Sequence, residues 1–591
     1  MSAIPSILTE QLDIWTSAAT EKKSGRGRSG GNGSSVYGIQ KLRALILELA
    51  VRGQLVPQDP NDEPASELFK RIQAEKARLI SEGKIKKDKP LPPISDEEKP
   101  FELPQGWVWG KLGDLCRLEN GDRSKNYPNK SVLVEKGIPF VNAGHLEDGR
   151  INRYEMTYIT QERYDLLRSG KFFNGDILYC LRGSLGKSAI VEGFDTGAIA
   201  SSLVIIRIYP YLSHHYFVDY FDSPLSYQMI KKYDNGTAQP NLSATDLEKF
   251  LIPLPSLSEQ HRIVAKVDEL MALCDQLESQ HNNAAEAHEK LVNHLLGTLT
   301  QSHSADDFSV NWQRIATHFE SLFTTEASID ALKQTLLQLA VMGKLVPQDP
   351  NDEPASELLK RIQAEKTRLV AEGEIKKNKP LPPITDEEKP FELPQGWRWV
   401  RLGNVLIKIT DGTHHSPPNI QKEAFKYISA KNIKSSGIDL SEITYVTKTV
   451  HNEIYGRCDP VLGDILYIKD GATTGIATIN TLDEPFSMLS SVALLKPSVG
   501  TNNQFLLKTI TSPLFYAEMR AEMTGVAITR VTLAKLNNAL IPLPPLAEQY
   551  RIVTKVDELM ALCDQLKSTI TQARQLQKKL ADVIVEQAVS S

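Results

Sequence analysis

The chain is a duplicated half-molecule, and this constrains its fold more than any other feature. Residues 55–107 run without a gap against residues 345–397, and 46 of the 53 positions are identical. A second pair of segments, residues 253–277 and 542–566, agrees at 21 of 25 positions. The period of the duplication is near 290 residues, whereas solenoid units repeat every ~20–50 residues. Two related halves are therefore expected, and a repeat array is not.

The order of the repeated segments is circular. The middle of the chain holds a copy of the C-terminal segment, followed by a copy of the N-terminal one. Joining the two chain ends would thus give two equal units, with a variable stretch inside each. We expect one chain that imitates a two-fold dimer, with constant helices pairing antiparallel and two variable domains held apart.

The constant regions predict shorter helices as well. Residues 39–57 place apolar side chains at helical spacing, which predicts an amphipathic helix ending near Gly53. Residues 329–347 repeat this pattern, and residues 64–87 predict a further helix before a Pro-rich extended segment. The Gly/Ser-rich residues 17–36 predict a flexible linker, with a DNA-touching arm as the alternative.

Residues 259–296 and their C-terminal copy each predict one long helix. Apolar positions alternate at spacings of four and three, which is typical of a coiled-coil seam. A helix packed on a globular core is the simpler alternative, but both copies keep the same phase. The pattern runs on through Leu291 and Leu580. The expected seam comprises Ile263, Val267, Leu270, Cys274 and Leu277, and in the second copy Ile552, Val556, Leu559, Cys563 and Leu566.

The stretches between the constant segments have a different texture. Short apolar runs rich in β-branched residues, such as "GDILYCLRG" and "GDILYIKDG", are separated by Gly, Asn and Asp, which predicts sheet-rich domains. The fold class is α+β. We expect a constant helical region at 1–107, a variable domain at 108–252, a central constant region at 253–397, a second variable domain at 398–541 and a constant helix at 542–591.

Composition limits the function classes. Five scattered cysteines without a CxxC pair argue against a zinc site or a disulfide framework. No apolar run approaches the ~18 residues of a membrane span, and a cytoplasmic protein is expected. The formal net charge of −5 argues only weakly against nucleic-acid binding, because net charge does not report local patches.

No catalytic constellation is apparent. "RGSLGKS" (182–188) ends like a phosphate-binding loop, but Leu181 stands where the pattern needs its first Gly. "DGTHHSP" (411–417) offers adjacent histidines without the i, i+4 spacing of helical metal ligands. We expect no metal ion, no bound cofactor and no enzymatic activity in this chain.

The chain resembles the specificity subunit of type I restriction–modification enzymes. The resemblance is carried by "PLPSLSEQHRIVAKVDEL" and "PLPPLAEQYRIVTKVDEL", by the two "GDILY" segments, and by "LPQGWVWGKLGDL" with its copy "LPQGWRWVRLGNV". These motifs cover nearly the whole chain. The long constant region before the first variable domain is similar to the subgroup with extended conserved N-termini.

The resemblance implies two target recognition domains, each reading one half of a bipartite, asymmetric double-stranded DNA site. It implies two methyltransferase subunits that bind S-adenosylmethionine, and two restriction subunits that use ATP and Mg²⁺. Near-identical constant repeats would supply twin docking surfaces for identical partners. Two alternatives remain: a scaffold that joins two partners without DNA, and a free-standing DNA-binding regulator.

Candidate DNA contacts are polar or cationic residues in Gly- and Asn-rich loops, where a backbone can approach DNA closely. A solvated loop residue is the competing interpretation for each one. In the first variable domain the candidates are Arg123, Lys125, Asn142, His145, Arg182 and Lys187. In the second they are Thr413, His414, His415, Lys431, Asn432, Lys469 and Arg530.

Overall fold

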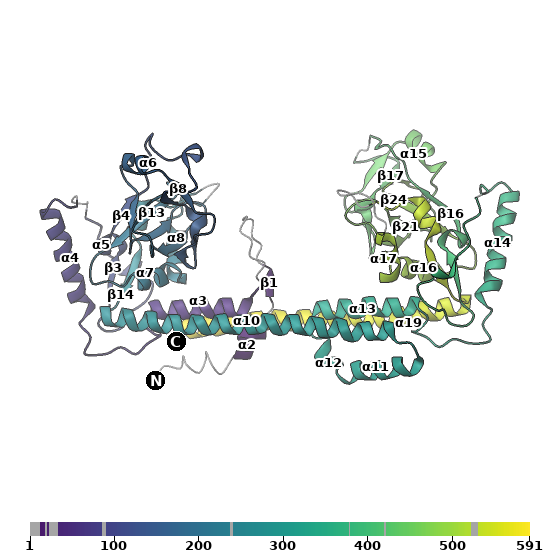
Figure 1. Ribbon diagram of the computed structural model, residues 1–591, viewed down its shortest axis with the longest axis horizontal. Helices are drawn as coiled ribbons and strands as arrows, with labels where there is room; N and C mark the ends of the chain where they lie inside the picture. The colour runs from purple at the N-terminus through teal and green to yellow at the C-terminus, as the bar shows by residue number, and fades with distance from the viewer. Residues whose placement is uncertain are drawn as a thin grey trace. The chain divides into compact units, whose positions relative to one another are not determined.

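The computed structural model describes residues 12–17, 20–22, 34–85, 90–236, 240–377, 379–418, 421–521 and 530–590. The chain divides into two compact units, residues 1–285 with 573–591 and residues 286–572. Both long helices, α10 (Leu257–Gln301) and α19 (Leu546–Ser590), contribute a part to each unit (Figure 1). Most of the Gly/Ser-rich segment predicted as a linker lies outside the described residues. Its ends pair as β1 (Thr20–Lys22) and β2 (Ser34–Val36).

Three helices share a core in the first unit: α3 (Tyr37–Val51), the first part of α10 and the last part of α19. The apolar face of α3 packs with buried residues of both long helices, because its apolar side chains recur at helical spacing. Ion pairs flank this core. Arg43 Nη2 lies 3.1 Å from Glu278 Oε2, and Lys41 Nζ lies 2.7 Å from Asp582 Oδ1. The helix α2 (Leu12–Ser17) packs beside α3.

The variable domain of the first unit contains three sheets, of orders β4-β13-β10-β11-β7-β6, β8-β5-β12-β9 and β14-β3. Pairing is antiparallel except for β11 with β7 and β12 with β5. The strands are β3 (Val108–Lys111), β4 (Cys116–Asn120), β5 (Ile138–Val141), β6 (Leu146–Glu147), β7 (Gly149–Ile151), β8 (Thr157–Ile159), β9 (Lys171–Phe173), β10 (Ile177–Cys180), β11 (Ser188–Ile190), β12 (Thr196–Ile199), β13 (Leu203–Ile208) and β14 (Leu251–Leu254).

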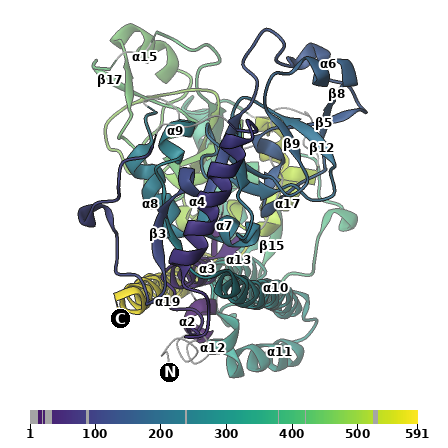
Figure 2. The same cartoon turned by 90° about the vertical axis from the view of Figure 1, so that its left-hand side faces the viewer.

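Helices complete this unit. The constant helix α4 (Ala65–Ser81) lies beside α5 (Leu112–Leu115), and Figure 2 shows α4 from its outer side. Ser223 caps α8 (Pro224–Tyr233), because its side chain accepts the backbone N–H of Ser226. Pro224 takes the first position of this helix. The remaining helices are α6 (Gln161–Leu166), α7 (His214–Phe221), α8 (Pro224–Tyr233) and α9 (Ala244–Leu247).

The second unit repeats this plan. Its sheets have the orders β16-β24-β21-β22, β20-β17-β23, β18-β19 and β15-β25. The strands are β15 (Arg398–Arg401), β16 (Leu406–Asp411), β17 (Phe425–Ile428), β18 (Ile433–Lys434), β19 (Gly437–Ile438), β20 (Thr444–Val446), β21 (Ile465–Ile468), β22 (Ala477–Ile479), β23 (Ser487–Met488), β24 (Val492–Pro497) and β25 (Leu540–Leu543).

Two short helices of the second unit precede α13 (Glu326–Val341). The short helices α11 (Ala305–Thr317) and α12 (Phe319–Leu322) follow α10 and share a core with α13, α10 and α19. The other helices are α13 (Glu326–Val341), α14 (Ala355–Ala371), α15 (Lys448–Tyr455), α16 (Asn503–Ile510), α17 (Pro513–Ala521) and α18 (Leu533–Asn538).

The two "GDILY" segments form the same turn and strand. Gly175–Asp176 precedes β10, and Gly463–Asp464 precedes β21, with glycine φ angles of 88° and 90°. Each aspartate accepts the backbone N–H three residues earlier, at 2.8 Å in both copies. Each also pairs with a cation on the neighbouring strand, Arg207 at 3.0 Å or Lys496 at 2.7 Å. The motif therefore fixes the start of a buried central strand.

The predicted seven-residue phase of the long helices is wrong beyond their first halves. Leu291 and Leu580 are 49% and 47% exposed, whereas Val292 and Ala581 are buried. These buried residues stand 29 positions after Ile263 and Ile552. At ~3.6 residues per turn that spacing makes about eight whole turns, whereas a heptad seam presupposes ~3.5 residues per turn.

The cysteines, possible metal ligands and long helices relate to the expectations drawn from composition. All five cysteines are buried and unpaired. No group of His, Cys, Asp and Glu suited to a metal ion lies among the residues that the structure describes. Within the same residues, no helix combines the length and apolar character that crossing a membrane requires.

Candidate functional site

A buried glutamate joins three segments of the first unit. Glu259, in the first turn of α10, accepts hydrogen bonds from Trp107 Nε1 at 2.9 Å and from Gln58 Nε2 at 3.2 Å. Burial raises the pKa of Glu259, and the two hydrogen bonds partly oppose that rise. The carboxylate thus ties the constant segment before α4 and the entrance of the variable domain to the long helix.

The second unit contains the same junction. Glu548 accepts from Trp397 Nε1 at 2.9 Å and from Gln348 Nε2 at 3.1 Å. Burial again raises the pKa of the carboxyl group, against the two hydrogen bonds. Near-identical sequences therefore build near-identical junctions, each inside its own unit.

The residue after each glutamate holds the variable domain. Gln260 Oε1 accepts the backbone N–H of Ser213 at 2.8 Å, and Gln549 Oε1 accepts that of Asn502 at 2.9 Å. Ser213 and Asn502, which donate these two bonds, directly precede α7 and α16, and their side chains cap the first turns of those helices. An ion pair on the neighbouring turn completes each junction, at 2.7 Å for Arg262 with Asp62 and 2.6 Å for Arg551 with Asp352.

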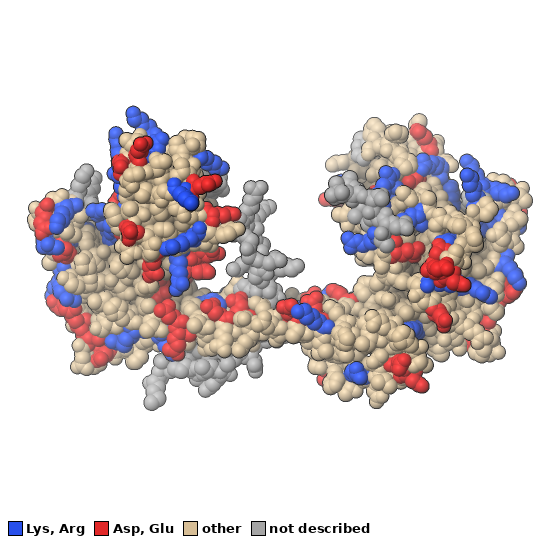
Figure 3. Space-filling view, viewed as in Figure 1, with Lys and Arg blue, Asp and Glu red and all other residues tan. Residues whose placement is uncertain are grey.

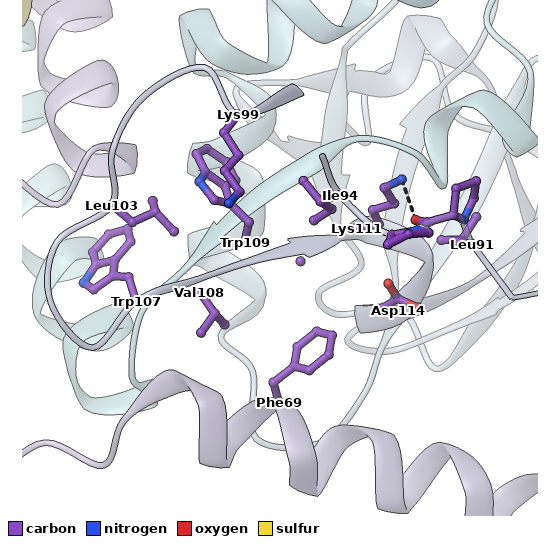
Figure 4. A pocket seen from close by; sticks show the side chains of 13 residues that line it. Phe69, Leu91, Ile94, Lys99, Leu103, Trp107, Val108, Trp109, Lys111 and Asp114 are labelled. Atoms are coloured by element: carbon purple, nitrogen blue, oxygen red, sulfur yellow. Dashed lines mark hydrogen bonds between the residues drawn. The ribbon is translucent and has the colours of Figure 1, made fainter. Parts of the chain in front are cut away.

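A pocket of about 530 Å³ lies beside the first junction, between α4, the Pro-rich segment and β3. Phe69 enters it from α4 and Trp109 from β3, as Figure 4 shows. Lys111 Nζ donates to the carbonyl oxygen of Pro92 at 2.8 Å and so fixes the extended segment along the pocket wall. The result is a recess walled by aromatic, proline and aliphatic side chains together with Lys99, Lys111 and Asp114, and most of its lining lies in the constant region.

Two of the predicted contacts in the first variable domain form part of a turn. His145 is buried, and its Nδ1 accepts the backbone N–H of Asn142 at 3.1 Å. Asn142 Oδ1 in turn accepts the N–H of Gly144 at 2.8 Å. Burial lowers the pKa of His145. These contacts close the 3-10 turn η3 (Ala143–His145), which favours a structural role for both side chains.

The other four predicted residues of this domain are exposed. Arg123 and Lys125 lie in the loop after β4, which is held by the buried carboxylate of Asp122. Arg182 Nε donates to Asn241 Oδ1 at 3.0 Å, and Lys187 Nζ donates to the carbonyl oxygen of Leu146 at 3.3 Å. Contact of these four with DNA stays a prediction.

The second variable domain repeats the turn at η6 (Ala430–Asn432). Asn432 is buried, its Oδ1 accepts the N–H of Ser429 at 3.0 Å, and its Nδ2 donates to the carbonyl oxygen of Asp439 at 3.1 Å. Lys431, between these contacts, is exposed. Thr413 Oγ1 accepts the N–H of His415 at 3.2 Å and shapes the loop after β16.

Three of the predicted residues in this domain belong to one network of charges around a buried aspartate. Asp411, 2% exposed, is contacted by Lys469 Nζ at 3.4 Å and by His414 Nε2 at 3.3 Å. Lys469 also reaches Asp470 at 2.9 Å. We define the Asp411 cluster as Asp411, His414, Arg457, Lys469, Asp470 and Arg530.

Arg457 was missed by the sequence reasoning. Its Nη2 donates to Asp411 Oδ1 and lies 3.0 Å from His414 Nε2. The residue stands two positions after α15 and follows Gly456, so a Gly-Arg pair after a short helix was the available signal. At the other end of the cluster, Arg530 Nε lies 3.3 Å from Asp470 Oδ1.

The surface charge of each unit is mixed. On the face shown in Figure 3, basic and acidic side chains alternate over both units. On this face, neither unit shows an extended surface of basic side chains alone.

The comparisons with known proteins agree with one another. The family model described as "Type I restriction modification DNA specificity domain" matches residues 104–287 and 394–573. The chain is 41% identical over 609 aligned residues to the EcoAI specificity subunit of a type I restriction enzyme from Escherichia coli. It is 39% identical over 604 residues to the corresponding EcoEI subunit from the same organism. Both alignments cover 100% of each protein.

A solved structure is also similar. The HsdS subunit from Thermoanaerobacter tengcongensis aligns with 83% of this chain and 98% of its own, at 20% identity and a TM-score of 0.39.

Proposed function

The chain belongs to the type I restriction modification DNA specificity family, and from that premise we propose how its parts divide the work. It is the DNA-recognition subunit of a type I restriction–modification system. The observation that carries this assignment is the end-to-end similarity to two specificity subunits, at 41% and 39% identity.

Each variable domain reads one half of a bipartite, asymmetric DNA site. The two domains share a strand plan and the "GDILY" turn, which supports a common way of presenting loops. Their loop residues differ, as base readout of two different half-sites requires. At the twin turns, for instance, Gly144 in one copy corresponds to Lys431 in the other.

The constant repeats dock two copies of a methyltransferase subunit. Residues 57–61 and 347–351 are exposed in both units and identical in sequence. Gln58 and Gln348 among them also serve their own junctions. For the exposed prolines Pro57 and Pro60, with Pro347 and Pro350, a shared partner is the physical reason to keep them alike. Recent duplication alone would leave the variable domains equally similar, and they are not. In the first unit, the recess lined by Phe69 and Trp109 also offers aromatic and charged side chains to such a partner.

The long helices set the length of unread DNA between the two half-sites. In this proposal α10 and α19 pair antiparallel and relate the two halves by a pseudo-two-fold axis. Both helices have 45 residues and a part in each unit. The number of unread base pairs should therefore depend on the length of these helices.

Chemistry belongs to the partners. S-adenosylmethionine binds the methyltransferase subunits, while two restriction subunits use ATP and Mg²⁺, and this chain acts in the cytoplasm without a cofactor of its own. The family resemblance implies this division, and the lack of a recognisable catalytic motif in the sequence agrees with it.

Reconstitution tests the proposal. The purified chain, alone and with its methyltransferase, is incubated with a library of randomised duplex DNA, and bound DNA is separated by gel shift and sequenced. We expect enrichment of a two-part asymmetric site, and light scattering should give two methyltransferase subunits per chain. Assembly without any sequence preference would instead support the scaffold. A sequence-specific complex that needs no methyltransferase would support the regulator.

A further inference from the structure

Arg457 is exposed to solvent, but contacts with neighbouring residues hold its guanidinium in place. Its side chain is 53% exposed, yet Nη2 donates to Asp411, whose side chain is 4% exposed. The imidazole of His414 contacts the same guanidinium nitrogen. A long cationic side chain loses much conformational freedom when it is fixed. The buried carboxylate therefore orients the guanidinium before any ligand arrives.

Asp411, which holds Arg457, is itself fixed within the sheet. Asp411 ends β16 and pairs in register with Ala493 of β24. On its other side Lys469, 2% exposed, reaches both Asp411 and Asp470. A buried carboxylate facing a buried ammonium and a guanidinium is compensated for its lost hydration. Its place in the sheet is consequently fixed by strand pairing as well as by charge.

The first variable domain lacks this arrangement. Strand register equates Asp411, opposite Ala493, with Asn120, opposite Val204. It likewise makes Ile468 equivalent to Cys180, so that the next residues, Lys469 and Leu181, correspond. Neither the buried aspartate nor the buried lysine has a charged residue at the equivalent register position. The first domain does bury Asp122, two residues after Asn120, but that carboxylate accepts the backbone N–H groups of Ser124 and Arg168. The Asp411 cluster is thus a property of the second domain.

This asymmetry decides between two kinds of DNA contact. Phosphates are the same under every sequence, so a contact to the backbone carries no sequence information. Two domains of common descent could keep such a contact in common. Two domains that read different half-sites must instead differ in the side chains that contact the bases. Arginine is suited to that role, because its two parallel N–H groups match O6 and N7 of guanine in the major groove.

We propose that Arg457 is a specificity-determining residue that reads a guanine in the half-site of the second variable domain, with Asp411 as its positioning residue. The proposal rests on the DNA-recognition function and deepens it. His414 borders the same guanidinium, and Lys469 holds Asp411 in place. Arg530, paired with Asp470 at the far end of the cluster, is 59% exposed.

Site selection on the reconstituted complex tests this. Duplex DNA randomised at every position is selected with wild-type protein, Arg457→Ala and Arg457→Lys, each with the methyltransferase. We expect both variants to lose a guanine preference at one position of one half-site, with the other half unchanged. Affinity for the wild-type site should fall about 10–100-fold. The slope of log Kd against log salt should change by less than about one, because no phosphate contact is lost.

A matched control and a positioning variant sharpen the result. Lys448→Ala removes an exposed cation from the start of α15, outside both the cluster and the predicted DNA contacts, and should leave the guanine preference intact. Asp411→Asn should weaken that preference while the complex still assembles, and the unfolding midpoint of each variant shows whether the domain remains folded.

Two outcomes overturn the inference. One is an unchanged base preference in Arg457→Ala. The other is a uniform loss of affinity over all sequences with a reduced salt slope, which would make Arg457 a phosphate contact. Either result would leave the DNA-recognition function standing, whereas a wild-type complex without sequence preference would remove both.

Discussion

The indole Nε1 of Trp107 donates a 2.9 Å hydrogen bond to Oε2 of Glu259, across 152 positions of sequence. Trp397 and Glu548 repeat the bond at the same distance in the second unit. In each unit this contact lies where the constant segment, the variable domain and the long helix meet. The duplicated sequence thus preserves a junction as well as separate elements.

Removing the indole N–H should loosen one unit only. We predict that Trp107→Phe destabilises the first unit by about 2 kcal/mol, because a buried carboxylate loses one of its donors. Hydrogen–deuterium exchange should report faster exchange in β3 and at the start of α10, with the second unit unchanged. Trp397→Phe should give the mirror result.

Trp109→Phe is the matched control, since Trp109 packs on Phe101 and does not contact Glu259. If Trp107→Phe and Trp109→Phe had the same effect, lost ring area would explain both, and the hydrogen bond would not be the cause.

The two units differ in charge where the variable domain meets the long helix. In the second, Lys508 Nζ lies 2.6 Å from Asp557 Oδ1. In the first, Asp219 takes the place of the lysine, and the corresponding helix residue is Asp268. We predict that Asp219→Lys stabilises the first unit by about 1 kcal/mol, measured by denaturant unfolding. Lys508→Asp should destabilise the second by a similar amount, and no change in either would discount this contact.

Asp219 also predicts a pH dependence. Burial raises the pKa of Asp219 well above its usual range, and the carboxylates of Asp268 and Asp222 add to the rise. An unfolded aspartate loses its proton near pH ~4, so above that pH the folded state binds more protons than the unfolded one. Stability contributed by the protonated group should therefore fall as the pH rises through the folded pKa.

The free energy of unfolding is measured for wild-type protein and for Asp219→Asn from about pH 4 to about pH 8, which begins near the pKa of an unfolded aspartate. The stability of the variant should fall less steeply with rising pH than that of the wild-type protein. An identical slope in both proteins would contradict the assignment to Asp219.

Much of the fold follows from local sequence patterns. Apolar spacing in residues 39–57 indicated a helix, and α3 (Tyr37–Val51) occupies that stretch. The run "GDILY" indicated a strand, and β10 and β21 begin two residues into it. Such patterns depend on neighbours within one or two turns, which the sequence displays directly.

What escaped prediction depends on distant parts of the chain. Burial shifts from the heptad position Leu291 to Val292, because over about eight turns a straight helix drifts away from a seven-residue repeat. His145 and Asn432 stand in polar loops, yet each turns inward to close its own backbone turn. Asp411 and Lys469 meet only because separate strands, β16 and β21, flank β24.

Lengthening the long helices should lengthen the unread spacer. A four-residue helical insertion after both Leu277 and Leu566 adds about one turn, or ~6 Å, to each helix. We expect the reconstituted complex to select the same half-sites with more unread base pairs between them. A change of base preference at an unchanged spacing would contradict a spacer set by these helices.

Exchange of one variable domain tests the central claim most directly. Residues 108–252 are replaced by the corresponding segment of a relative with a different known site, and the bound site is determined by selection and sequencing with the methyltransferase present. The account predicts that one half-site changes to that of the donor, while the other half-site and the spacer stay as they were. A change in both half-sites, or in neither, would contradict two independent recognition domains in one chain.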